Sequence, residues 1–171
     1  MSDSAGSKDL ALPYVLGHSD QEIDRLSAQA RLIAPFTRQL FRDAGIVPGM
    51  RVLDVGSGAG DVALLVAELI GKTGEVIGTD RAPAAIAAAS RAAELRSLGN
   101  VHFREGDPAE MAFEQPFDAV VGRYVLLYSD DRSLMLRRLA RHLRPGGLIV
   151  FHEPDWSCVR SVPPAPSYDR C

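Results

Sequence analysis

Residues 51–61 read RVLDVGSGAGD, and this stretch decides the fold. A short, mostly apolar run over residues 51–55 leads directly into three alternating glycines, Gly56, Gly58 and Gly60, and an apolar pattern with helical spacing follows. Alternating glycines between a strand and a helix let the backbone pass close to a ligand where no side chain intrudes. This context favours a ligand-binding turn over a plain glycine-rich connection.

The alternation of strands and helices continues along the chain. Strands are expected over residues 51–55, 75–79, 101–104, 117–121 and 148–152, and helices over residues 83–98 and 130–143. The segment Pro145-Gly146-Gly147 is expected to end the last helix, and residues 20–44 predict one or two helices bent near Pro35. Apolar strands that alternate with helices predict an α/β fold with a doubly wound, mostly parallel sheet.

Length, charge and cysteine content restrict the class of protein. The chain has 171 residues and a net charge of -3, which predicts one compact domain without the basic field that nucleic acid or an anionic membrane requires. Its apolar runs fall far short of the ~20 residues that cross a bilayer, and its polar first residues predict a cytoplasmic protein. Cys158 and Cys171 supply neither a disulfide framework nor a zinc site, so no metal is expected.

Two aspartates stand at strand ends near the glycine turn. Asp54 lies two residues before the first glycine, where a carboxylate suits a cationic amine better than a pyrophosphate. Asp80 ends the second strand, where an acid can accept the hydroxyls of a ribose, with a solvated turn or helix cap as the alternative. The spacing argues against NAD, because Asp61 stands where the G-x-G-x-x-G pattern has its last glycine.

Five segments together resemble a known family. They are VLDVGSGAGD (52–61), VIGTDRA (76–82), REGDPAEM (104–111), FDAVVGRYVLLY (117–128) and LRPGGLIVFHEP (143–154). In order and spacing they resemble the motifs of the class I S-adenosylmethionine-dependent methyltransferases that act on small molecules. The resemblance implies a Rossmann-like sheet with strand order 3-2-1-4-5, without the last two strands of the family's sheet, and S-adenosylmethionine as the cofactor.

The resemblance also implies which residues contact the cofactor, from its methionine portion to its adenine: Asp54, Gly56, Ser57, Gly58, Gly60, Asp80, Arg81, Asp107, Pro108 and Arg123. Within this set, Asp54 stands near the methionine amino group and Asp80 binds the ribose. Asp107 accepts a hydrogen bond from the adenine amino group. Arg123 lies near the methionine end and the substrate.

Pro108 departs from the family's pattern. Family members usually offer the backbone N–H of this residue to an adenine ring nitrogen, and proline has none. Adenine would then be held by Asp107, by a neighbouring amide such as that of Ala109, or by packing on Arg81 and Pro108. A plain turn over residues 106–108 is the alternative for Asp107.

No catalytic residue is assigned, and the candidates are His152, Tyr124 and His18. His152 ends the fifth strand and is placed to take a proton from a hydroxyl or amine, although a hydrogen-bonded structural histidine is the commoner case. Tyr124, like Tyr128, offers an aromatic surface to a sulfonium or a substrate, with core packing as the alternative. Residues 14–29, with Tyr14, His18 and Gln29, resemble the lid of small-molecule methyltransferases, and a plain packed helix is the alternative.

These observations predict methyl transfer from S-adenosylmethionine to a small-molecule acceptor, without nucleic acid or membrane. The alternatives are a cofactor-binding module without turnover and, less favoured, an NAD-dependent oxidoreductase. We expect residues 1–19 to form a flexible N-terminus and lid segment, residues 20–157 the cofactor-binding domain with N-terminal helices over 20–44, and residues 158–171 a proline-containing tail. The arginines at positions 137–144 are expected on a solvated helix face.

The fifth strand has no successor in this chain. Residues 148–151 are therefore expected to pair with a second copy, as a homodimer, or to be covered by the tail. The tail is the weaker candidate, because Pro163, Pro164 and Pro166 cannot donate hydrogen bonds to a strand. We favour a chain that is a fragment of a longer enzyme over a complete chain whose edge a partner covers.

Overall fold

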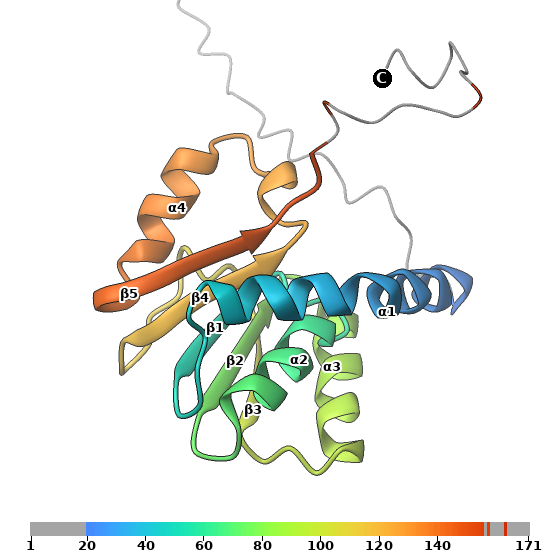
Figure 1. Ribbon diagram of the computed structural model, residues 1–171, viewed down its shortest axis with the longest axis horizontal. Coiled ribbons are helices and arrows are strands. Elements are labelled where there is room, and N and C mark those ends of the chain that lie inside the picture. The colour runs from blue at the N-terminus through green and yellow to red at the C-terminus, as the bar shows by residue number, and fades with distance from the viewer. Residues whose placement is uncertain (1–19, 156, 158–162, 164–171) are drawn as a thin grey trace, which may run out of the picture.

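The computed structural model describes residues 20–155, 157 and 163, and their core is a layered α/β arrangement (Figure 1). Within these residues, five strands form one parallel sheet in the order β3-β2-β1-β4-β5. Their bounds are β1 (Arg51–Val55), β2 (Glu75–Asp80), β3 (Val101–Glu105), β4 (Phe117–Arg123) and β5 (Leu143–His152). The doubly wound sheet and the strand order expected from the sequence are confirmed.

Helices cover both faces of the sheet. They are α1 (Asp20–Asp43), α2 (Asp61–Ile70), α3 (Pro83–Leu95) and α4 (Arg132–Ala140), with a short 3-10 helix, η1 (Leu126–Tyr128), before α4. Figure 1 shows α4 on one side of the sheet and α1, α2 and α3 on the other. Parallel neighbours need crossover connections of this kind, because a tight hairpin joins only antiparallel strands.

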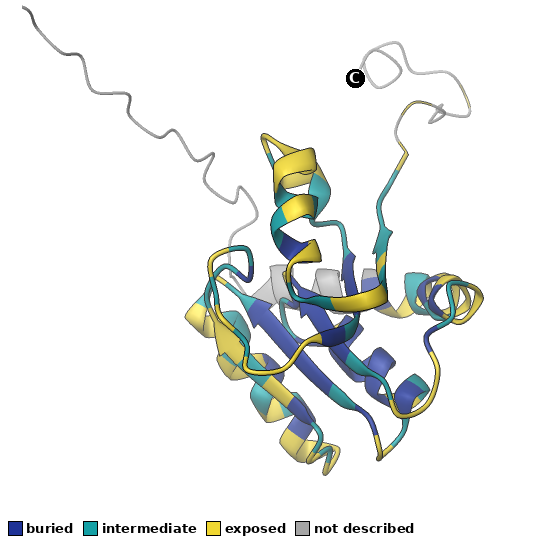
Figure 2. Cartoon of the chain, turned by 90° about the vertical axis from the view of Figure 1, so that its left-hand side faces the viewer, coloured by how far each residue is buried: buried dark blue, intermediate teal, exposed yellow. Residues whose placement is uncertain are grey.

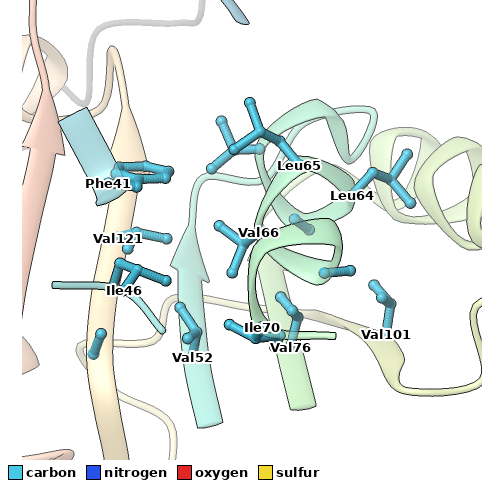
Figure 3. Close-up of a cluster of buried hydrophobic side chains, with 14 of the residues drawn as sticks. Phe41, Ile46, Val52, Leu64, Leu65, Val66, Ile70, Val76, Val101 and Val121 are labelled. Atoms are coloured by element: carbon cyan, nitrogen blue, oxygen red, sulfur yellow. The ribbon is translucent and has the colours of Figure 1, made fainter. Parts of the chain in front are cut away.

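Two apolar clusters fill the space between the sheet and its helices. The larger cluster joins α1, α2 and α3 to the sheet and includes Phe41 and Val66 (Figure 3). Side chains alternate between the faces of a strand, so Val52 belongs to this cluster while Leu53 and Val55 belong to the smaller cluster under α4. Burying each such large side chain contributes roughly 1.5–3 kcal/mol. Figure 2 shows the buried strands between helices that expose their outer surfaces.

α1 is one helix, so the option of two helices is excluded. It runs through Pro35, which has no backbone N–H and so removes one hydrogen bond from the middle of the helix. Phe41 is fully buried in the larger cluster, whereas Leu32 and Phe36 are 77% and 72% exposed. Packing of the buried face against α2 and β5 offsets the lost hydrogen bond.

α4 is shorter than predicted. It ends at Ala140 with Arg141 as its C-cap, whereas the sequence predicted a helix over residues 130–143. At its other end the carboxylate of Asp131 accepts a hydrogen bond from the backbone N–H of Leu134 at 2.8 Å. The chain must turn back into the sheet after α4, because β5 already begins at Leu143.

β5 is longer than predicted and contains the segment that was expected to end the helix. Phe117 of β4 pairs with Leu143, but Ala119 pairs with Leu148, so residues 144–147 form a bulge in β5. The prediction that Pro145-Gly146-Gly147 ends a helix is therefore wrong. A proline is tolerated in a strand at such a bulge, where its missing N–H breaks no ladder hydrogen bond.

Both carboxylate oxygens of Asp118 accept hydrogen bonds at the edge of the sheet where the strands begin. Its Oδ1 accepts a hydrogen bond from Nε of Arg144 at 2.5 Å, and its Oδ2 accepts from the backbone N–H of Arg51 at 2.7 Å. Burial opposes ionisation, but these donors and the two arginine charges hold the pKa of Asp118 below its usual value. Arg144 therefore ties β5 to β4 and does not lie on a helix face, contrary to expectation.

The two predicted terminal segments, residues 1–19 and 158–171, lie outside the described residues apart from Pro163. β5 stands at one end of the strand order, and no other described strand pairs with its outer side. Among the described helices, none has the length and apolar character needed to cross a membrane. The same residues contain no group of three or more His, Cys, Asp or Glu side chains that could hold a metal ion.

Candidate functional site

The carboxyl ends of the strands meet at one edge of the sheet. Because neighbouring strands are parallel, β2, β4 and β5 place Asp80, Arg123 and His152 along this edge. The chain order reverses at β1, which pairs with β2 on one side and with β4 on the other. Ligands of open α/β sheets bind beyond such a reversal. The glycine turn, residues 56–60, follows β1 at this point.

The three glycines of the turn have positive φ angles but different surroundings. A Cβ atom on Gly56 would lie 2.9 Å from a methyl group of Val125, and one on Gly60 would lie 3.0 Å from the ring of Phe103, so a side chain at either position would displace its neighbours as well as strain the backbone. A Cβ atom on Gly58, where φ is +52°, would meet nothing within 4 Å. Gly58 therefore borders open space at the strand ends, which packing within the described chain does not explain.

Asp54 is buried just before this turn, with 1% of its surface exposed. Neither of its carboxylate oxygens has a hydrogen-bond partner in the part of the chain that the structure describes. Burial raises the pKa of Asp54 to about 8, assisted by Asp80 and Asp61 and opposed by the positive charge of Arg123 and the backbone N–H of Ala63. A buried carboxyl group without a partner is costly, and a cationic ligand group would remove much of that cost.

Further polar groups adjoin the turn. Ser57 is 6% exposed, and its Oγ has no partner among the described residues. Asp61 begins α2, and burial raises its pKa while Arg123 lowers it. A cleft of about 130 Å³ opens beside them between α1 and α2, and Arg31, Asp61 and Arg123 contribute to its polar lining. Positively charged arginines and a negatively charged aspartate thus lie next to the turn, as binding of the carboxylate and ammonium groups of an amino acid ligand would require.

Asp80 ends β2 and supports the glycine turn. Its Oδ2 accepts a hydrogen bond from the backbone N–H of Gly58, and its Oδ1 accepts from that of Ala82, both at 2.9 Å. A carboxylate offers about four acceptor positions, so these two bonds leave room for two hydroxyl donors. The turn role that was considered as the alternative for Asp80 is present, and it is compatible with a ribose contact.

Asp107 forms a turn and an ion pair together. Its Oδ2 accepts from Nη2 of Arg81, and its Oδ1 accepts from the backbone N–H of Ala109 at 2.9 Å. The amide of Ala109, one of the donors considered for adenine, is therefore already engaged. Pro108 is buried with its carbonyl 2.7 Å from Nε2 of His142, so it presents little surface for packing, whereas the Arg81 side chain is 77% exposed.

Arg123 and His152 meet a residue of α1 that sequence reasoning missed. Thr37 is fully buried, its Oγ1 lies 2.9 Å from Nδ1 of His152, and it accepts from Nη1 of Arg123 at 3.5 Å. Burial and Arg123 lower the pKa of His152, while Glu153 acts in the opposite direction. The imidazole is therefore mostly neutral at pH 7. No sequence signal marks Thr37, because 115 residues separate it from His152.

Glu153 fixes the segment that follows β4. Its Oε1 accepts from the backbone N–H groups of Val125 and Leu126 at 2.8 and 3.0 Å, and its Oε2 is buried without a partner in the described chain. Tyr124 adopts a φ of +59°, which is uncommon for an aromatic residue, and its ring centroid lies 5.9 Å from that of His152. Backbone strain of this kind often accompanies functional sites.

The remaining predicted residues lie elsewhere. Tyr128 is 58% exposed on η1, so it does not form part of the core. Tyr14 and His18 lie outside the described residues, as does the side chain of Gln29. A larger open groove, about 540 Å³, lies between α3 and β3 and includes none of the predicted site residues in its lining.

A comparison with known proteins identifies the family. A family model described as a methyltransferase domain matches residues 46–165, which contain the whole sheet and the glycine turn. The chain belongs to the class I S-adenosylmethionine-dependent methyltransferases. This membership confirms the family that the five sequence segments resemble, and it implies S-adenosylmethionine as the cofactor.

Relatives of this methyltransferase domain include methyltransferases named for a naphtoquinone and for aklanonic acid. It is 38% identical over 112 residues to the 2-phytyl-1,4-naphtoquinone methyltransferase of Synechococcus elongatus, covering 63% of this chain and 48% of that protein. It is 34% identical over 155 residues to the aklanonic acid methyltransferase DauC of a Streptomyces species, covering 90% and 69%. The chain thus spans about half the length of the cyanobacterial relative.

A solved structure shows the same fold. The S-adenosylmethionine-dependent methyltransferase from Aquifex aeolicus superposes on this methyltransferase domain with a TM-score of 0.67 at 22% identity. The match covers 78% of this chain and 72% of that one. At this identity the likeness supports the fold alone.

Proposed function

We propose that this chain binds S-adenosylmethionine at the carboxyl ends of β1, β2 and β3 and transfers its methyl group to a small-molecule acceptor. One observation carries the proposal: the buried, unpaired carboxyl group of Asp54 precedes a glycine turn whose Gly58 faces open space. An unpaired buried carboxyl group favours a cationic partner, and the methionine portion of the cofactor carries an ammonium group. Family membership and the small-molecule relatives support the same cofactor and acceptor class.

The carboxylates of neighbouring strands fit successive parts of the cofactor. Asp54 would pair with the ammonium group, and Asp80 retains acceptor positions for the ribose hydroxyls. Asp107 retains acceptor capacity for the adenine amino group, and the exposed Arg81 beside it offers a planar surface for the ring. We accordingly assign cofactor binding to the domain over residues 20–157.

The turn would hold the methionine portion. Gly56, Ser57, Gly58 and Gly60 would bring backbone close to it, and the hydroxyl of Ser57, which has no partner among the described residues, would be available to a polar group of the ligand. Arg123 would lie near the methionine carboxylate, since it already lines the adjoining cleft. When bound, the cofactor supplies an electrophilic methyl group, which the acceptor attacks as the carbon–sulfur bond breaks and leaves its electron pair on sulfur. The chain mainly has to align the two molecules and exclude water.

Titration calorimetry with S-adenosylhomocysteine tests cofactor binding directly. The chain offers a matched pair of variants, Gly58→Ala and Gly71→Ala, because both glycines have positive φ and open space around the position of a Cβ atom. Gly71 caps the C-terminal end of α2, at the other end of this helix from the turn. Both variants introduce backbone strain, but only Gly58→Ala is expected to weaken binding, by tenfold or more. Absence of binding heat for the folded parent chain would contradict the proposal.

A cofactor-binding module without turnover is the second candidate. The observation that favours it is the length of the chain, which spans 48% of the cyanobacterial relative and so need not contain a whole acceptor site. Binding of S-adenosylhomocysteine without methyl transfer to any of a panel of phenols, amines and carbon acids would support this candidate. Transfer to any of them would support the enzyme. The NAD-dependent oxidoreductase would be supported only if NADH competed with S-adenosylhomocysteine for binding to the chain.

The homodimer through the edge of β5 stays a prediction. β5 ends the strand order, and Ile149 on it is 37% exposed, which leaves an apolar strand edge available for pairing. Sedimentation under reducing conditions tests this, with a concentration-dependent dimer as the expected result. A monomer at high concentration, with the β5 amides protected from exchange, would show that the chain covers its own edge.

A further inference from the structure

The hydroxyl of Thr37 has three polar neighbours from three parts of the chain. Its Oγ1 lies 3.3 Å from the carbonyl of Ile33 on the preceding turn of α1, 2.9 Å from Nδ1 of His152 and 3.5 Å from Nη1 of Arg123. Thr37 has no exposed surface, so water does not complete these contacts. The three neighbours must therefore share one hydroxyl hydrogen and two lone pairs.

Only one proton assignment makes all three contacts hydrogen bonds. The carbonyl of Ile33 can only accept, so it takes the hydrogen of Thr37. The guanidinium of Arg123 can only donate, so it occupies one lone pair. The remaining lone pair must accept from Nδ1 of His152, which therefore carries the ring proton.

We propose that Thr37 is a positioning residue that holds neutral His152 as the Nδ1–H tautomer and so leaves the lone pair of Nε2 free to act as the base for the methyl acceptor. This inference rests on the proposed function. Nε2 would take the proton from a hydroxyl or amine of the acceptor while that oxygen or nitrogen bonds to the methyl carbon, and the proton would then pass to solvent. Hydrogen bonding of one ring nitrogen commonly sets the state of the other.

The surroundings of His152 favour this role. Nε2 has no hydrogen bond to the described residues, and His152 is half-buried at the carboxyl end of β5. The charged groups that act on the ring are Arg123 from β4 and Glu153 just after β5. Burial and Arg123 dominate, and they keep the ring neutral at pH 7, as a base requires.

A second histidine provides an internal control. Nε2 of His142 lies 2.7 Å from the carbonyl of Pro108, which can only accept a hydrogen bond. In its neutral form His142 must therefore carry its proton on Nε2, the opposite tautomer from His152. One spectrum of the same folded chain should show both tautomers.

Long-range proton–nitrogen NMR of the ¹⁵N-labelled full chain without cofactor, at pH 7.5, tests the assignment. His152→Gln and His142→Gln identify the two rings. We expect the Nδ1–H pattern for His152 and the Nε2–H pattern for His142. Thr37→Val should convert His152 to a mixture or to the Nε2–H form, and Thr37→Ser should restore the parent pattern. An Nε2–H pattern for His152 in the parent chain would overturn the proposal without any variant.

Turnover tests the base role separately. With any phenol or amine that the chain methylates, His152→Gln should lower kcat by about 100-fold or more, the usual contribution of a positioned base. Thr37→Val should lower kcat more than it changes KM and should shift the pH profile, and Thr37→Ser should restore both. Unchanged kcat in His152→Gln would overturn the base role. Failure of the chain to bind S-adenosylhomocysteine would count against the proposed function alone, because the NMR pattern needs no cofactor.

Discussion

Asp54 and Asp118 lie on the neighbouring strands β1 and β4, but at opposite ends of the sheet and in opposite states. Asp118 has a hydrogen-bond donor on each oxygen and a pKa held below its usual value. Asp54 accepts no hydrogen bond within the described chain, and burial raises its pKa to about 8 although the nearby backbone N–H of Ala63 opposes this rise. The end where the strands begin pairs its half-buried carboxylate within the chain, whereas the end where they finish leaves a fully buried carboxyl group without a hydrogen bond in the described residues.

The two carboxyl groups should change stability with pH in opposite directions. Asp54 binds a proton in the folded chain between about pH 4 and pH 8 and loses it in the unfolded chain, so it lowers the free energy of unfolding as pH rises through this window. Asp118 keeps its charge in the folded chain below its usual pKa, so its stabilising contribution is lost as pH falls into the acid range. A group that destabilises the free protein at neutral pH is typical of a binding site.

The largest expected effect is that of Asp54→Asn. Without the carboxyl group of Asp54, the ammonium group of the ligand would have no partner, which costs about 3 kcal/mol or more. Calorimetry should therefore show at least ~100-fold weaker binding of S-adenosylhomocysteine. The same variant should gain stability relative to the parent as pH rises from 5 to 8.5, measured by urea unfolding. Loss of both affinity and stability would show that Asp54 is a structural residue.

Asp80→Ala should reduce both the free energy of unfolding and the affinity for S-adenosylhomocysteine. Asp80 is intermediate between Asp54 and Asp118, because it lies at the proposed site but already accepts hydrogen bonds from the chain. It already accepts from the amides of Gly58 and Ala82, so its removal leaves two donors at the turn unpaired and costs about 1–2 kcal/mol in the free energy of unfolding. Affinity for S-adenosylhomocysteine should fall by roughly 1.5–3 kcal/mol. Asp80→Asn keeps one acceptor oxygen and should recover part of each loss. Unchanged affinity in both variants would remove Asp80 from the proposed site.

Asp118→Ala tests the other end of the sheet. It should lower the free energy of unfolding by about 1–2 kcal/mol, because the backbone N–H of Arg51 and the side chain of Arg144 lose their acceptor. Affinity for S-adenosylhomocysteine should stay within about twofold of the parent, since the strand ends that form the proposed site are unchanged. A large loss of affinity in a folded Asp118→Ala variant would mean that the two ends are not independent.

The features predictable from sequence are those set by neighbours along the chain. The glycine turn, Asp54 and Asp80 occupy positions fixed by a strand and the helix after it, and the structure places them at one edge as expected. Their contacts with a cofactor stay predictions. Thr37 and Glu153 could not be found this way, because their partners come from segments brought together only by the folded sheet. The bulge at residues 144–147 could not be predicted for a similar reason: Pro-Gly-Gly commonly ends a helix, and only pairing with β4 places this segment in a strand.

The smallest expected effect is the pH dependence of binding, and it tests why Asp54 differs from Asp118. If the ammonium of S-adenosylhomocysteine pairs with ionised Asp54, binding at pH 7 must release the proton that this group holds with a pKa of about 8. The ionised fraction rises about fivefold from pH 7 to pH 8, so affinity should rise by about fivefold, or ~1 kcal/mol. Calorimetry in two buffers of different ionisation enthalpy should show the released proton at pH 7. The Asp118→Ala variant should still release this proton on binding, because Asp118 in the parent chain is fully ionised well below pH 7 and does not contribute to the release. Affinity that is constant from pH 7 to pH 8, with no proton released, would mean that Asp54 is already charged in the free chain and that the proposed contrast between the two ends is wrong.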